Sequence, residues 1–88
     1  VHKAVPKSDL IGAALDLASQ IADGAPLALR ALKAMLQATA HLDLRDAMAC
    51  TRPGQSQVPT YEAMIASEDF HEGIAAFVER RAPVWKAR

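Results

Sequence analysis

The segment SEDFHEGIAAFVERRAPVWKAR, residues 67–88, carries the clearest structural signal in the chain. Ser67 is placed to cap a helix, and the acids that follow it lie in the first turn, where the helix dipole favours negative charge. Arg80 and Arg81 are expected in the last turn, where positive charge is favoured, and Pro83 is expected to end the helix. Large apolar side chains recur at helical spacing at Phe70, Ile74, Phe77 and Val78. The segment therefore predicts an amphipathic helix.

Similar signals predict further helices upstream. Ser8 is expected to cap a first helix that ends at Gly24, and Pro26 is expected to start a second one. Because the connection between them is short, we expect these two helices to pack side by side. Asp43 is expected to cap a third helix that reaches about Cys50. The apolar stripe of the first helix is formed by Ile11, Ala14, Leu15, Ala18, Ile21 and Ala22.

Two segments do not read as helix. Residues 51–60, TRPGQSQVPT, contain two prolines and a glycine and are predicted to form a loop, with helix resuming at about Tyr61. Residues 1–6, VHKAVP, alternate apolar and polar residues and read as a short strand or an extended arm, which either pairs outside this chain or lies on the helices. The predicted fold is all-α, with four to five helices in residues 7–88, an interrupting loop at 51–60 and the arm at 1–6.

Composition limits the possible partners. The chain has 88 residues, which fits one small domain, and its net charge is zero, so a nucleic-acid partner is not expected. A single cysteine forms no internal disulfide, and a reducing, cytoplasmic location is expected. No apolar run is long enough to cross a bilayer, and the start of the chain lacks the apolar core of a signal peptide, so no membrane association is expected.

Possible catalytic groups lie near the start of the last helix. Ser67 and His71 share a helix face, but Asp69 points to a different one, and a serine triad needs the histidine to bridge both. A cap serine and a surface histidine are the favoured interpretation. Glu72 next to His71 is interpreted as part of a solvated helix face.

Metal-binding and thiol chemistry are not expected either. His2, His41 and Cys50 lack the paired spacings that are typical of zinc sites. Cys50 has no base near it in the sequence, which favours a core or boundary thiol. No catalytic residue and no metal ligand is therefore predicted.

The end of the chain places cationic groups near aromatic rings. Arg80, Arg81 and Lys86 accompany Tyr61 and Trp85. Arginine suits phosphate and flat rings suit a nucleobase. The alternative interpretation is that the arginines complement the helix dipole and that the rings pack in the core.

The tail resembles the C-terminal signature of the crotonase family, the enoyl-CoA hydratases and isomerases. That signature runs approximately S-E-D-F-x-E-G-x-x-A-F-x-E-K/R-R-x-P-x-F/W-x-G, and residues 67–85 meet nearly every position. VHKAVP is similar to the last core strand of the family, and residues 10–26 and LALRALKAML are similar to the helices that follow it. The resemblance covers most of the chain and implies the C-terminal helical region of the crotonase fold.

The resemblance also implies a function. A complete member of the family acts on an acyl-CoA substrate, as an enoyl-CoA hydratase (a lyase) or isomerase of fatty acid metabolism, without a covalently bound cofactor. Its catalytic groups lie in an N-terminal region that this chain lacks, so this part would supply CoA contacts and an oligomer interface. Tyr61 falls where the family places an aromatic residue near the adenine, and Arg80 falls where it places a basic residue near the CoA phosphates. The implied partner is a trimer-type homo-oligomer or a separate N-terminal crotonase-like chain.

One departure and one alternative remain open. The family usually runs an unbroken helix from about Asp43 to the residue before Ser67, whereas residues 51–60 interrupt it near the acyl pocket and the subunit contacts. A degenerate gene, a specialised lid and an ordinary loop are all compatible with this interruption. The alternative function is a standalone helical interaction or oligomerisation module, or a gene remnant, without enzymatic activity.

Overall fold

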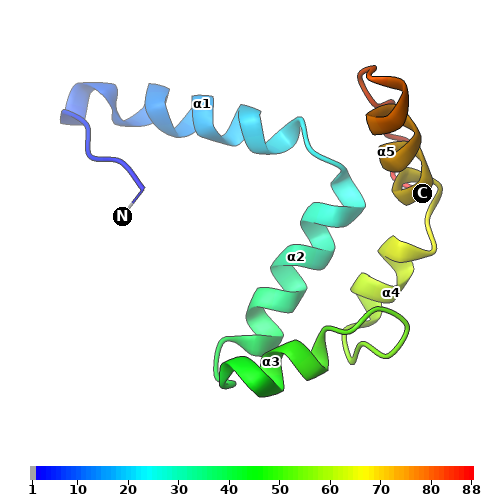
Figure 1. Cartoon of the computed structure of the whole chain (residues 1–88). Helices are drawn as coiled ribbons and strands as arrows, with labels where there is room; N and C mark the ends of the chain where they lie inside the picture. Colours follow the sequence, from blue (N-terminus) through cyan, green and yellow to red (C-terminus); the bar gives the residue numbers. More distant parts are fainter. Residues whose placement is uncertain (1) are drawn as a thin grey trace.

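The computed structural model describes residues 2–88 and is built from helices joined by short connections (Figure 1). The elements are a 3-10 turn η1 (Lys7–Asp9) and the helices α1 (Leu10–Ala22), α2 (Pro26–Thr39), α3 (Leu44–Cys50), α4 (Pro59–Ile65) and α5 (Glu68–Glu79). Residues 2–88 contain no strand, so the predicted all-α fold with four to five helices is confirmed.

The N-terminal arm is described only in part. Val1 lies outside the described residues, and residues 2–6 form neither helix nor strand. The division into an arm at 1–6 and a helical domain at 7–88 stays a prediction.

Local capping chemistry sets three of the helix starts as predicted. The Asp43 carboxylate accepts the N–H of Asp46 at 2.9 Å, and the Ser67 hydroxyl accepts the N–H of Phe70 at 3.2 Å. Pro26 is the first residue of α2, where its missing N–H costs nothing. These side chains satisfy or avoid the free donors that every helix start presents.

Three local predictions were wrong in position. Ser8 caps no helix, because Pro6 opens a 3-10 turn in which Asp9 donates its N–H to the carbonyl of Pro6 at 2.9 Å. The fourth helix begins at Pro59, two residues earlier than expected, since proline is well suited to the first helical position. α5 ends at Glu79, so Arg80 and Arg81 lie beyond its last turn.

The predicted side-by-side packing of the first two helices is also wrong. α2 packs mainly against α4, and α1 points away from both (Figure 1). Ala25 is extended (φ −58°, ψ 119°), as residues before proline tend to be, so α2 leaves in a new direction. The stripe of α1 stays open, with Ile11 70% and Leu15 63% exposed.

The result is an open arrangement with little core. The radius of gyration is 16.0 Å, whereas a compact domain of this length has one of roughly 12 Å. Only Ala31, Val58 and Ala76 are buried apolar residues in the part of the chain that is described. None of the helices in residues 2–88 combines the length and the apolar character that a bilayer span requires.

Candidate functional site

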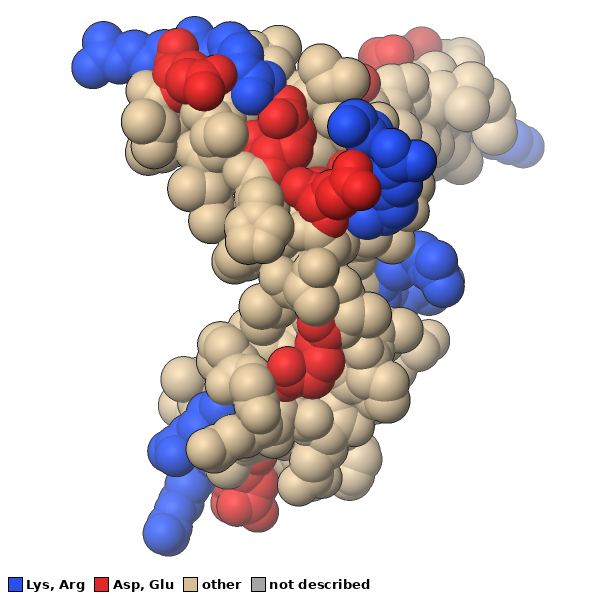
Figure 2. Space-filling model, turned by 90° about the vertical axis from the view of Figure 1, so that its right-hand side faces the viewer, with Lys and Arg blue, Asp and Glu red and all other residues tan. Residues whose placement is uncertain are grey.

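Residues 81–88, called the tail below, fold back along α5 and make polar contacts with it. The N–H of Asp69, in the first turn of α5, donates to the carbonyl of Arg88 at 3.0 Å. Glu68 pairs with Lys86 at 3.6 Å and with Arg88 at 3.2 Å. Figure 2 shows acidic and basic side chains gathered side by side on the upper part of the face that α5 and the tail form.

Asp69 is the buried anchor of the tail. It is only 3% exposed, and its two carboxylate oxygens accept the backbone N–H groups of Lys86 at 2.8 Å and Ala87 at 2.9 Å. A buried carboxylate is costly unless hydrogen bonds satisfy it, and these two N–H groups do so. The acid in the first turn therefore serves the tail as well as the helix dipole.

Glu72 holds the other end of the tail. It accepts two hydrogen bonds from the Arg81 guanidinium, at 2.6 and 2.9 Å, and one from the N–H of Val84 at 2.8 Å. The bonds from Arg81, followed by the one from Val84, lower the pKa of Glu72 to about 2. The same bonds, together with Glu79, raise the pKa of Arg81 above its ordinary value.

The contact between Glu72 and Arg81 was missed in the sequence, where Glu72 was interpreted as part of a solvated helix face. The available signal was the pattern of acids at 68, 69 and 72 followed by bases at 81, 86 and 88. Helical spacing puts no base of the tail next to an acid, so only the reversal of the chain after α5 brings them together.

Ser67 and His71 do not form a catalytic pair. The Ser67 hydroxyl accepts the N–H of Phe70 and donates to the carbonyl of Met64 at 2.6 Å. Both its donor and its acceptor are therefore used in the helix cap. The His71 ring packs edge to face on Phe70, with 5.8 Å between the ring centroids. Within residues 2–88, no three His, Cys, Asp or Glu side chains are grouped so that they could hold a metal ion.

The two predicted CoA-binding residues lie on different elements. Tyr61 is half-buried in the first turn of α4, and Arg80 is exposed just past the C-terminal end of α5, which points away from α4 (Figure 1). The 12 residues of α5 span about 18 Å at the helical rise. Nothing in the described contacts joins the two side chains.

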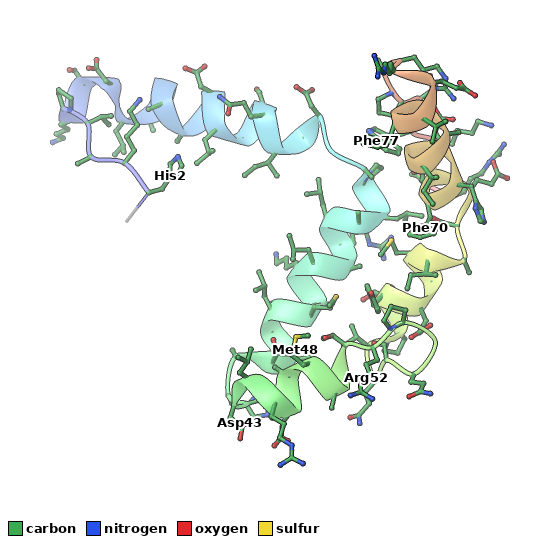
Figure 3. All side chains as sticks on the ribbon, viewed as in Figure 1. His2, Asp43, Met48, Arg52, Phe70 and Phe77 are labelled. Carbon is green, nitrogen blue, oxygen red and sulfur yellow. The ribbon has the colours of Figure 1, made fainter. Side chains whose placement is uncertain are left out.

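An apolar groove of about 340 Å³ lies between α5, the start of α2 and the end of α4. Phe70 and Phe77 project from α5 toward the side on which α1 and α2 lie (Figure 3). The main lining side chains are Leu27, Met64, Phe70, Ile74, Phe77 and Trp85. The groove can take an apolar group.

Trp85 of the tail also lines this groove. Its ring lies over Gly73, where an added Cβ would come 3.4 Å from the indole, and its N–H donates to the carbonyl of Asp23 at 3.2 Å. The tail therefore touches the corner between α1 and α2 as well as α5.

The whole chain matches known proteins. Residues 1–88 match the family model described as enoyl-CoA hydratase/isomerase. A carnitinyl-CoA dehydratase of Salmonella typhi is 40% identical over 88 residues, which are 100% of this chain and 33% of that protein. The chain thus spans about a third of the length of the curated relatives it matches.

Solved structures show the same helical arrangement. A protein from Novosphingobium aromaticivorans, described as a short chain enoyl-CoA hydratase, superposes with a TM-score of 0.81 at 34% identity, over 100% of this chain and 32% of that one. An enoyl-CoA hydratase from Bacillus anthracis gives 0.73 at 31% identity, over 96% of this chain and 30% of that one. The open arrangement of helices therefore recurs within larger proteins.

Proposed function

The chain belongs to the enoyl-CoA hydratase/isomerase family, and on this premise we propose that the complete protein adds water to, or removes it from, a CoA thioester. The match over residues 1–88 is the observation that carries this proposal. Among its relatives, one is named a dehydratase of a CoA ester and others are named enoyl-CoA hydratases, and these names describe opposite directions of one reaction type. An acyl-CoA is then the substrate, and isomerisation is the related alternative.

Within that protein, residues 1–88 contribute contacts to the nucleotide end of CoA. Arg80 supports this role because it is exposed and makes no ion pair within the described part of the chain. Guanidinium groups bind phosphates with two hydrogen bonds, and aromatic rings stack on bases. Tyr61 is assigned to the adenine and Arg80 to the phosphates.

The second contribution is an interface, either in a trimer-type homo-oligomer or with a separate N-terminal crotonase-like chain. The accessible surface is 7038 Å², whereas a compact protein of this mass exposes roughly 5000 Å². Large apolar side chains contribute to this surface, since Leu10, Ile11, Leu15 and Ile21 of α1 are more than half exposed and Phe77 of α5 is 85% exposed. Surfaces of this kind are typical of protein contacts.

Residues 1–88 are not expected to catalyse the reaction by themselves. The polar groups that resemble catalytic residues, Ser67, Asp69 and Glu72, are all engaged with the helix cap or the tail. The test is an enoyl-CoA hydration assay on the 88-residue chain and on the complete protein. We expect turnover only with the complete protein. Turnover by the chain alone would overturn the assigned role, and a complete protein inactive on every CoA thioester would overturn the reaction class.

A further inference from the structure

The C-terminal end of α5 has an unusual backbone. Arg80 adopts the left-handed conformation (φ 53°, ψ 42°), which helices commonly use at this position with glycine. Its N–H donates to the carbonyl of Phe77 at 3.3 Å, and the N–H of Arg81 donates to the carbonyl of Ala76 at 3.0 Å. An arginine here bears a steric cost that glycine would avoid. Such a strained residue motivates a search for a role of its side chain.

The residues after Arg80 hold this turn in place. Arg81 reaches back along α5 to Glu72 and also bonds Glu79, while Val84 donates its N–H to the same Glu72 carboxylate. Glu72 therefore binds the chain at two points after the turn, the side chain of Arg81 and the backbone N–H of Val84. The left-handed conformation of Arg80 turns the chain back along α5, where these bonds form.

The two neighbouring arginines thus have different environments. The guanidinium of Arg81 is committed to Glu72 and Glu79, whereas Arg80 has no carboxylate partner within residues 2–88. The carbonyl end of a helix repels anions, so any anion bound here depends on a guanidinium that projects away from that end.

We propose that Glu72 and Arg81 are positioning residues for Arg80, which they hold in the left-handed conformation that presents its guanidinium to the phosphates of CoA. This inference rests on the proposed function of Arg80. It adds that Glu72 affects CoA binding without touching CoA, because it holds Arg81 and thereby the turn at Arg80.

The test is a double-mutant cycle on the complete protein, with CoA as the probe and binding measured by calorimetry. We expect Arg80→Ala to weaken CoA binding about tenfold, the usual size for a lost charged hydrogen bond. Glu72→Gln should weaken it in the same direction, and the double variant should bind no more weakly than Arg80→Ala alone. An S-acyl pantetheine, which lacks the nucleotide, should bind all variants equally.

Glu68→Gln is the matched control, because it removes the ion pairs with Lys86 and Arg88 at the other end of the tail but leaves the bonds of Arg81 intact. We expect it to bind CoA as the unaltered protein does. If Glu72→Gln weakens CoA binding equally with and without Arg80, or if Glu68→Gln has the same effect, the positioning role is overturned while the role of Arg80 stands. If Arg80→Ala leaves CoA binding unchanged, the proposed role of Arg80 fails instead.

Arg80→Gly separates the backbone from the side chain. We expect a higher melting temperature, because glycine adopts the left-handed conformation freely, together with the same loss of CoA affinity as Arg80→Ala. A lower melting temperature would overturn the claim that the arginine is kept at a cost.

Discussion

α1 and α5 are similar in length but are held in different ways. α5 has a serine cap, a left-handed C-terminal turn and a tail fastened to three acids on its first and second turns. α1 has no side-chain cap, and Leu10, Ile11, Leu15 and Ile21 are each more than half exposed. The comparison indicates that polar contacts within the chain fix α5, whereas the apolar face of α1 stays exposed within residues 2–88.

The largest expected effect comes from removing the buried anchor of α5. Asp69→Ala leaves the N–H groups of Lys86 and Ala87 without an acceptor, so we expect the tail to open more easily by about 3 kcal/mol. Hydrogen exchange at these two amides measures the change. The amides of α1 should exchange as before. In Asp69→Asn, the exchange rates at Lys86 and Ala87 should lie between those of the unaltered protein and those of Asp69→Ala. If the Ala87 amide stays equally protected from exchange, Asp69 does not anchor the tail.

A matched pair of serines tests the two helix starts. Ser67→Ala removes a cap and should cost about 1 kcal/mol. Ser8→Ala removes a side chain that caps nothing and should have almost no effect. Chemical denaturation of the two variants measures both changes. Equal costs would show that α1 is capped after all.

Acid should loosen the end of the tail that Glu72 holds. The pKa of Glu72 is lowered from 4.5 to about 2, so its stabilising effect is complete above pH 4.5 and is lost as the pH falls from there toward about 2. Fluorescence of Trp85, the single tryptophan, should report this loosening. Glu72→Gln should remove this part of the pH dependence. A transition that persists in that variant would assign it to another group.

The smallest expected effect is on the open face of α1. Leu15 is 63% exposed, so Leu15→Ser in the 88-residue chain should change its unfolding free energy by less than about 0.5 kcal/mol. In the complete protein, the same substitution should be costly if this face is covered there. A large loss of unfolding free energy in the 88-residue chain would mean that α1 packs against other parts of that chain.

The sequence predicted what depends on local chemistry. The caps at Asp43 and Ser67 and the start at Pro26 are confirmed, because the residue that satisfies each helix end lies beside it in the chain. The 3-10 turn before α1 was missed because Ser8 looks like a cap in isolation, while Pro6 decides the local geometry.

Features that depend on distant contacts were not predicted. The tail was missed because Asp69 and Glu72 bind residues 9 to 18 positions away along the chain. The direction of α2 was missed because the short connection at Gly24 also permits an open corner. Tyr61 and Arg80 came from the family resemblance, and their roles stay predictions.

The segment between α3 and α4 shows how a loop can be ordered without depending on most of its own side chains. The Glu62 carboxylate, in the first turn of α4, accepts the backbone N–H groups of Gly54 at 3.2 Å and Ser56 at 2.8 Å, and Val58, next to α4, is only 5% exposed. Backbone N–H groups are supplied by any residue except proline. The exposed side chains of Gln55 and Gln57 are thus free to change while α4 keeps its position, so this stretch is well suited to tolerate sequence variation and to carry a grafted label or peptide.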